Sequence, residues 1–169
     1  MKICSWNARG LGNPRGIRTL CDLIQREAPE VLFLQETRLT TREVESCKYK
    51  FGFKNCLAIS SQGRKGGIAL LWDAEVDLSV TSYSMNHVDA VIKDPNLRRG
   101  QWFLTAMYGY PKTHLRYQTW NLLRMLCRAN DDPWMVMGDF NEVMYSHEKC
   151  GGRPRPDSQL YDFREVVEE

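Results

Sequence analysis

The sequence predicts a mixed α/β domain, and two patterns support this prediction. Short apolar runs, each typical of a buried strand, occur at Ile3–Trp6, Val31–Leu34 and Trp134–Met137. Stretches with a helical period of apolar residues alternate with stretches of strand-like texture. With 169 residues, of which 43% are hydrophobic and 26% charged, the chain is long enough and apolar enough for one packed core. We therefore expect a single domain over residues 1–169.

A helix is predicted directly after the first strand. The segment Gly10–Pro14 is rich in turn formers, and Pro14 suits the first turn of a helix because an amide hydrogen is not needed there. Apolar side chains then follow at i, i+3, i+4 and i+7, which marks one buried face: Ile17, Leu20, Cys21 and Ile24. The dipeptide Ala28–Pro29 should end this helix.

The second strand, Val31–Leu34, is apolar throughout. We therefore expect it in the centre of a sheet, with both faces covered. A short helix should follow and run towards Cys47, because Thr40 and Glu43 have the spacing of a capping box.

From Phe53 onwards the sequence indicates mostly antiparallel strands. Five strand-like runs follow one another: Leu57–Ile59, Gly67–Trp72, Val76–Tyr83, Val88–Ile92 and Trp102–Tyr108. The segment Ser60–Gly67 is typical of a hairpin connection between the first two. A last strand ends at Asp139, and helices with one apolar face are predicted around Leu115–Cys127 and from Asp157 onwards.

Charge and targeting features exclude several classes of protein. The net charge of +2 is too small to indicate a nucleic-acid partner by itself. No stretch approaches the roughly 20 apolar residues of a membrane helix, and Asn7 and Arg9 interrupt the first apolar run too early for a signal peptide. We expect a soluble intracellular protein, nuclear or cytoplasmic, that is not secreted. The six cysteines show no C-x-x-C pair, which favours free thiols over disulfides or structural zinc.

Polar residues follow all three apolar runs. Asn7 follows the first run, Gln35 and Glu36 follow the second, and Asp139 and Asn141 follow the third. If the three strands lie side by side in one sheet, these side chains gather along a single edge. Ligands of open α/β sheets bind outside the carboxyl ends of the strands. The sequence therefore predicts one site rather than three separate turns.

These residue types suit metal-assisted phosphate chemistry. Glu36 and Asp139 offer hard oxygen ligands, and magnesium is typically held by one or two carboxylates while it keeps several waters. Asn7 and Asn141 can complete a coordination shell or hold a water and a phosphoryl oxygen. Tyr108 ends a predicted strand and can offer its hydroxyl to the same group. The reaction that these roles favour is phosphodiester hydrolysis.

Each residue taken alone also has a simpler interpretation. Asn7 and Asp139 are common turn residues, because Asn and Asp side chains bond to their own backbone. Glu36 is typical of a solvated strand end. Arg64 and Lys65 either contact phosphate or form a hairpin tip, and the tip is favoured because no helix N-terminus follows. Only the combination of residues indicates one function.

Five motifs, taken in order, resemble the endonuclease/exonuclease/phosphatase superfamily. They are Cys4–Leu11 (CSWNARGL), Phe33–Thr37 (FLQET), Gly66–Ala69 (GGIA), Tyr108–Pro111 (YGYP) and Gly138–Asn141 (GDFN). The resemblance covers essentially the whole chain. It is strongest to the endonuclease-like domain of plant non-LTR (LINE-type) retrotransposon proteins, in which a reverse transcriptase follows.

The resemblance implies a four-layer α/β sandwich and a phosphodiesterase that uses Mg²⁺, or Mn²⁺ in its place. Glu36 matches the principal metal ligand of the family, and Asn7 matches a second metal-site residue. Tyr108 and Asn141 match residues that contact the scissile phosphate, and Asp139 matches the aspartate that positions or activates the attacking water. The implied partner is DNA. Basic side chains are candidates for contacts to its backbone: Arg9, Arg15, Arg64, Lys65, Arg98 and Arg99.

One element of the family pattern is absent from the sequence. The family has a later Ser-Asp-His element, whereas the histidines here follow Asn86, Thr113 and Ser146. We therefore expect that the C-terminal part of the sandwich is missing, and the resemblance suggests a parent polypeptide with a reverse transcriptase. Two other functions stay open: a catalytically inactive remnant that binds metal or nucleic acid weakly, and a relative that acts as a small-molecule phosphatase.

Overall fold

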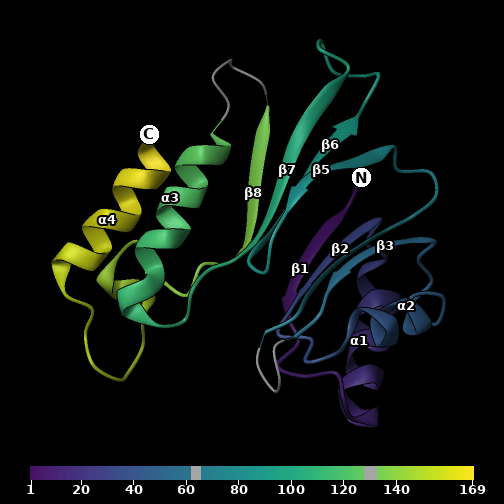
Figure 1. Ribbon diagram of the computed structural model, residues 1–169, viewed down its shortest axis with the longest axis horizontal. Coiled ribbons are helices and arrows are strands. Elements are labelled where there is room, and N and C mark those ends of the chain that lie inside the picture. The colour runs from purple at the N-terminus through teal and green to yellow at the C-terminus, as the bar shows by residue number, and fades with distance from the viewer. Residues whose placement is uncertain (62–65, 128–132) are drawn as a thin grey trace. The chain divides into compact units, whose positions relative to one another are not determined.

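The computed structural model describes residues 1–61, 66–127 and 133–169. Within these ranges eight strands form two four-stranded sheets, accompanied by four α-helices, so the mixed α/β class is confirmed (Figure 1). The chain divides into two compact units, Met1–Met107 with Asp132–Gly138 and Tyr108–Asp131 with Asp139–Glu169. None of the helices in the described ranges combines the length and apolar character needed to cross a bilayer.

The first sheet has the order β1-β2-β4-β3, with β1 (Ile3–Asn7) parallel to β2 (Val31–Gln35). The strands β4 (Ile68–Trp72) and β3 (Asn55–Ile59) continue it in antiparallel fashion, as expected for a hairpin. Every residue of β2 is buried, which confirms the prediction of a central strand covered on both faces. The register pairs Asn7 with Gln35, so β1 and β2 end at the same edge of the sheet.

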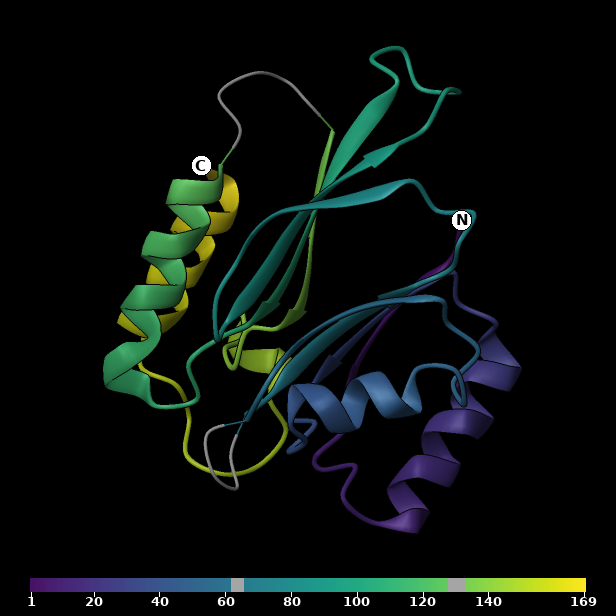
Figure 2. The same cartoon turned by 45° about the vertical axis from the view of Figure 1, so that its right-hand side comes forward.

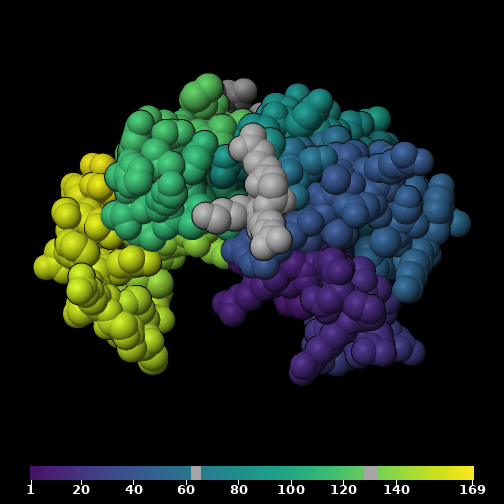
Figure 3. All heavy atoms as spheres, turned by 60° about the horizontal axis from the view of Figure 1, so that its bottom comes forward, coloured from purple at the N-terminus to yellow at the C-terminus, as the bar shows by residue number. Residues whose placement is uncertain are grey.

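Helices α1 (Pro14–Glu27) and α2 (Thr41–Cys47) cover one face of the first sheet (Figure 2). The side chain of Asn13 caps α1 by accepting from the amide of Gly16 at 2.8 Å. The capping box predicted from Thr40 and Glu43 is present at α2. Apolar residues of both helices join the core beneath them, and in the space-filling view the amino-terminal segments form one continuous surface (Figure 3).

The second sheet has the order β5-β6-β7-β8 and contradicts one expectation. Its strands are β5 (Leu78–Tyr83), β6 (His87–Lys93), β7 (Gln101–Tyr108) and β8 (Trp134–Asp139). The first three pair in antiparallel fashion. Bonds from the Phe103 amide to the Pro133 carbonyl and from the Gly109 amide to the Asp139 carbonyl keep a constant offset, so β8 runs parallel to β7. Thus β8 lies in the second sheet, whereas β1 and β2 lie in the first. The expectation that the three strands followed by polar residues lie in one sheet is wrong.

A chain of hydrogen bonds between polar side chains, with Asp89 and Thr105 buried, links β8 to the other strands of the second sheet. The indole of Trp134 donates to Thr105 Oγ1 at 2.8 Å, and Thr105 donates to Asp89 at 2.6 Å. Thr81 donates to the other oxygen of Asp89 at 2.6 Å. These four residues come from β8, β7, β6 and β5, so the chain of bonds follows the strand order of the sheet. Because a buried carboxylate is costly without partners, this order satisfies Asp89.

The second unit contains the helices α3 (Arg116–Leu126) and α4 (Asp157–Glu168), with the single-turn helices η1 (Thr113–Leu115) and η2 (Ser146–Glu148). The rings of Trp120 and Phe163 stack with their centroids 4.7 Å apart and hold α3 against α4. Phe140, just after β8, packs on the same Phe163 at 5.4 Å. Both predicted helices are confirmed, although Leu115 lies in η1 rather than in α3.

Candidate active site

In the first unit, Asn7 and Glu36 meet at the edge where β1 and β2 end. Asn7 donates through Nδ2 to Glu36 Oε1 at 3.2 Å, and its Oδ1 accepts from the Arg9 amide at 3.1 Å. The second bond is the turn contact that an asparagine makes with its own backbone. Asn7 therefore makes the turn contact of its simpler interpretation and also lies next to Glu36, as expected for two residues at one edge of the sheet.

Backbone geometry turns the chain sharply at this edge. Arg9, Glu36 and Arg38 have φ values of 50°, 51° and 56°, in the left-handed region that residues other than glycine rarely adopt. Each such residue costs on the order of 1–3 kcal/mol, and such residues cluster at functional sites. The carbonyls of Gly66 and Gly67 accept from the amides of Arg38 and Thr37 at 3.1 and 3.0 Å, so the two residues just before β4 hold this turn.

Glycine is required at one of these positions. Gly67 has a φ of +83°, and a Cβ atom there would lie 2.5 Å from Thr37 Oγ1. A side chain would therefore displace the segment that carries Glu36. The close approach to Thr37 thus explains why the second residue of the GGIA motif, Gly67, is a glycine.

The surroundings of Glu36 leave its carboxylate accessible. Its side chain is 25% exposed, and Arg38 Nη2, with which it forms an ion pair, lies 3.9 Å from Oε2. The amide group of Gln35 donates to Ser5 Oγ at 2.7 Å, which ties β1 to β2. Gln35 therefore fixes the two strands next to Glu36.

The donor set of this edge fits a hard divalent cation that keeps most of its waters. Glu36 supplies one carboxylate, and magnesium is commonly held by one or two. Asn7 turns its NH₂ group towards Glu36, so it orients the carboxylate; as a direct ligand it would have to present Oδ1 instead. Over the described residues there is no group of three or more His, Cys, Asp and Glu that could hold a metal ion.

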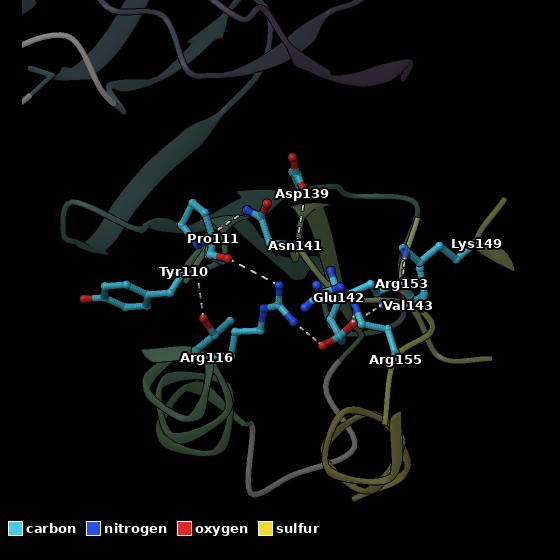
Figure 4. A network of polar contacts seen from close by, with 12 residues as sticks. Tyr110, Pro111, Arg116, Asp139, Asn141, Glu142, Val143, Lys149, Arg153 and Arg155 are labelled. Atoms are coloured by element: carbon cyan, nitrogen blue, oxygen red, sulfur yellow. Dashed lines mark hydrogen bonds and ion pairs between the residues drawn. The ribbon is translucent and has the colours of Figure 1, made fainter. Parts of the chain in front are cut away.

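In the second unit, Asp139 and Asn141 are held by the segment that follows β7. The amide of Asn141 donates to Asp139 Oδ1 at 2.9 Å, and Asn141 Nδ2 donates to the Gly109 carbonyl at 2.8 Å (Figure 4). The Gly109 amide donates to the Asp139 carbonyl at 2.7 Å. Tyr108 is the last residue of β7 and is buried. The turn interpretation of Asp139 is therefore also realised, and within this unit Asp139 and Asn141 lie together.

Close approach of two backbones explains Gly109. A Cβ atom at Gly109 would lie 2.7 Å from the carbonyl carbon of Phe140 and 2.9 Å from its Cα. Such distances are shorter than real side chains allow, so glycine permits the contact between the Gly109 turn and the Asp139–Asn141 turn. The φ of 56° at Asn141 places another left-handed residue at this turn.

A buried ion cluster that sequence reasoning missed begins one residue after Asn141. Glu142 forms ion pairs with Arg116 and with Arg155, the second with 2.9 Å between Arg155 Nε and Glu142 Oε1. The side chain of Glu142 is only 1% exposed. Nothing in the sequence separates this glutamate from a surface glutamate, because its partners lie 26 residues upstream and 13 residues downstream.

The predicted basic contacts fall into two groups. Arg9, Arg15, Arg98 and Arg99 have exposed side chains, as a contact to a phosphate backbone requires. Arg64 and Lys65 lie outside the described residues.

The histidine of β6 is a buried structural group rather than part of either edge. His87 Nδ1 lies 2.7 Å from Ser84 Oγ, and Nε2 lies 3.1 Å from Ser82 Oγ. Burial lowers the pKa of His87 below its ordinary value, and the charge of Asp89 opposes this effect in part.

Comparison with known proteins extends this description. The chain matches the Endonuclease/Exonuclease/phosphatase family over residues 4–164. An AP endonuclease from Archaeoglobus fulgidus has a similar structure, with a TM-score of 0.65 and 18% identity over 98% of this chain and 68% of that chain. A 3′ phosphatase from Neisseria, bound to a product DNA hairpin, gives a TM-score of 0.68 and 16% identity over 99% of this chain and 70% of that chain.

A third similar structure comes from zebrafish. D. rerio TDP2, complexed with a single-strand DNA product, gives a TM-score of 0.56 and 22% identity over 83% of this chain and 60% of that chain. At these identities the three likenesses describe the fold. They agree with the two-sheet α/β architecture.

Proposed function

The chain belongs to the endonuclease/exonuclease/phosphatase family, and from this premise we propose that it is a divalent-cation-dependent phosphodiesterase that cleaves DNA. The observation that carries the proposal is the polar end of β2, where an accessible carboxylate, Glu36, is oriented by Asn7 on a strained turn. Two similar structures, the Neisseria phosphatase and D. rerio TDP2, are complexes with DNA products, which supports DNA as the substrate class.

In this proposal Glu36 holds the cation and Asn7 orients Glu36. A bound Mg²⁺ or Mn²⁺ supplies neutralisation of the phosphoryl charge and polarisation of the phosphorus–oxygen bond. The contact between Asn7 Nδ2 and Glu36 Oε1 limits the rotation of the carboxylate. The left-handed backbone at Glu36 fixes the direction in which its side chain leaves the sheet.

The residues of the second unit act on the phosphate and the water. Asp139 accepts the proton of the attacking water, and one of its carboxylate oxygens is already held by the Asn141 amide. Asn141 and Tyr108 donate to phosphoryl oxygens, which favours the charge that develops during in-line attack.

Exposed arginines are the proposed contacts to the DNA backbone: Arg9, Arg15, Arg98 and Arg99, with Arg64 and Lys65 from the glycine-rich segment. Such contacts carry no sequence information, so they predict weak target preference and a strong dependence of binding on salt. The slope of the logarithm of the binding constant against the logarithm of the salt concentration measures the number of such contacts. A slope that corresponds to fewer contacts than the proposed residues would show that some of them do not contact the DNA.

We also propose that the chain derives from a plant LINE-type element and operates inside the cell. The support is the ordered set of five motifs, including GDFN at Gly138–Asn141. The genomic sequence around the coding region tests this origin. A reverse transcriptase reading frame in the same element supports it, and its absence from every copy contradicts it.

A non-catalytic binding protein is the second candidate function. The observation that favours it is that residues 1–169 do not themselves supply a Ser-Asp-His element, since the three histidines follow Asn86, Thr113 and Ser146. A phosphatase acting on small molecules is a further alternative within the enzyme class. Inositol phosphates and 3′-phosphorylated DNA, offered beside plain duplex, distinguish it from a nuclease.

Nicking of supercoiled plasmid with Mg²⁺ tests the proposed function. We expect cleavage by the natural chain, no cleavage with chelator, and loss of at least 100-fold in Glu36→Ala and Asp139→Asn. Glu169→Gln is the control, because Glu169 is an exposed residue after α4. No cleavage by the natural chain at any protein concentration would instead favour the binding protein.

A further inference from the structure

A buried cluster of three charges lies next to the Asp139–Asn141 turn. Glu142 Oε2 pairs with Arg116 Nη1, and Glu142 Oε1 lies 2.9 Å from Arg155 Nε (Figure 4). The side chain of Glu142 is 1% exposed, that of Arg116 7% and that of Arg155 29%. A buried carboxylate needs such charged partners, so the cluster is strongly sensitive to the loss of any member.

The cluster joins three segments of the second unit. Arg116 begins α3 and also donates through Nη2 to the Pro111 carbonyl at 3.3 Å, so it reaches the segment after Gly109. Arg155 lies just before α4. Glu142 also accepts from the Val143 amide at 3.2 Å, which fixes the backbone that continues from Asn141.

The segments that the cluster joins are those that hold Asp139 and Asn141. Asn141 donates to the Gly109 carbonyl, and Gly109 donates to the Asp139 carbonyl. Glu142 follows Asn141 directly, and Pro111 follows Gly109 by two residues. Both backbones of the turn contact are thus anchored through Arg116 and Glu142, within two residues of their hydrogen bonds.

A second ion cluster in the same unit offers a comparison. Arg124 of α3 pairs with Glu165 of α4 at 3.5 Å and with Glu169 at 2.7 Å. These carboxylates are exposed, with Glu169 at 44%, and their ion pairs are with Arg124 of α3. This exposed cluster joins α3 to α4. A substitution in it therefore weakens the contact between the two helices without removing a group that holds the Asp139–Asn141 turn.

We propose that Glu142, together with Arg116 and Arg155, is a positioning residue for Asp139 and Asn141. This inference rests on the proposed function, in which Asp139 and Asn141 act on the water and the phosphate. Glu142 does not touch the substrate in this proposal. It fixes the turn, and a displacement of about 1 Å at a reacting group costs on the order of 100-fold in rate.

The experiment compares Glu142→Gln, Arg155→Gln and Arg155→Lys with the control Glu169→Gln. In plasmid or oligonucleotide cleavage we expect kcat to fall 10- to 100-fold in Glu142→Gln and Arg155→Gln, with KM changed less than threefold. The reason is that the affected residues act on the reacting phosphate and not on the rest of the DNA. Arg155→Lys keeps the charge and should recover at least half of the natural kcat.

Hydrogen exchange gives a readout that needs no activity. The amides of Gly109 and Asn141 donate to Asp139. We expect their exchange to accelerate at least tenfold in Glu142→Gln and in Arg155→Gln, and to stay unchanged in Glu169→Gln. If Glu142→Gln does not fold, Arg155→Gln decides, because Arg155 is the most exposed member of the cluster.

The outcomes separate the two proposals. Unchanged exchange at Gly109 and Asn141 in Arg155→Gln overturns the positioning role, whatever the activity. A fall in kcat of the same size in Glu169→Gln also overturns it, because helix docking alone would then explain the effect. An inactive natural protein contradicts the proposed function, and the exchange measurement still decides whether the cluster holds the turn.

Discussion

The two polar strand ends of this protein are held in different ways. At the end of β2, Glu36 contacts a side chain, Asn7, and lies 3.9 Å from the guanidinium of Arg38, and it is 25% exposed. At the end of β8, Asp139 and Asn141 bond to backbone groups at 2.7–2.9 Å, and the next residue, Glu142, is buried in an ion cluster. The carboxylate at the first edge is partly exposed to solvent, whereas the polar side chains at the second edge are held by hydrogen bonds to the backbone.

This difference matches the two tasks in the proposed mechanism. A cation site must exchange water and protein ligands, so a partly exposed carboxylate at the end of a strand suits it. Groups that align a water and a phosphoryl oxygen act best when they are preorganised, which requires that their geometry is already set by the surrounding chain. In the proposed mechanism, the first edge therefore determines the affinity for the cation, and the second edge determines the rate of reaction.

The largest expected effect separates the two edges by cation binding. Glu36→Gln removes the carboxylate at the end of β2, so we expect loss of Mn²⁺ binding and a fall in cleavage of at least 1,000-fold. Asn141→Ala should leave Mn²⁺ binding within about threefold and lower kcat about 100-fold. Titration of Mn²⁺ by electron paramagnetic resonance measures the first quantity without any substrate. Equal loss of Mn²⁺ binding in both variants would break the comparison.

The second effect concerns stability. Glu142→Ala leaves two arginines at a buried site without their carboxylate, and we expect the free energy of unfolding to fall by about 3–5 kcal/mol. Glu36→Ala removes a weak, partly exposed pair and should cost about 1 kcal/mol or less. Urea unfolding followed by fluorescence measures both. Similar losses for the two variants would show that the edges do not differ in how they are held.

The third effect compares two glycines. A Cβ atom at Gly109 would lie 2.7 Å from the Phe140 carbonyl carbon, whereas at Gly12, in the loop after β1, no heavy atom lies within 4 Å. We expect Gly109→Ala to destabilise the protein by about 1–3 kcal/mol and to lower kcat. Gly12→Ala should be neutral or slightly stabilising. Thermal unfolding measures the difference, and a neutral Gly109→Ala would contradict the close backbone contact.

The smallest effect is a dependence of stability on pH that belongs to neither edge. Burial lowers the pKa of His87 from its ordinary value of 6.5. The unfolded chain therefore takes up the proton first as the pH falls, so stability is greatest above about 6.5 and declines from there towards the lower pKa of the folded state. In His87→Gln this decline should be smaller, as measured by urea unfolding between pH 7.5 and 5. An unchanged decline would place it at another group.

Several parts of the fold and site followed from the sequence. Local signals were sufficient for α1, with its turn at Gly10–Pro14, and for α2, with its capping box. The apolar run Val31–Leu34 correctly predicted a central strand, because only a strand covered on both faces contains no polar position. The meeting of Asn7 with Glu36 followed from two strands that end at one edge.

The remaining parts depend on contacts between distant residues. Strand periodicity does not specify a partner, so the sheet that contains β8 was not predictable from Trp134–Met137. That choice depends on the bonds that link Trp134, Thr105 and Asp89 across 45 residues of chain. Glu142 was missed for the same reason, because its burial is set by Arg116 and Arg155 and not by its neighbours in sequence.

The central claim is that Glu36 holds the divalent cation that cleavage of DNA requires. Paramagnetic broadening of amide signals by substoichiometric Mn²⁺ tests it most directly. We predict broadening at Asn7 and Glu36 in the natural protein, and we predict that these signals stay sharp in Glu36→Gln, which also loses cleavage. Sharp signals at Asn7 and Glu36 in the natural protein, or broadening that persists in Glu36→Gln, would contradict the claim.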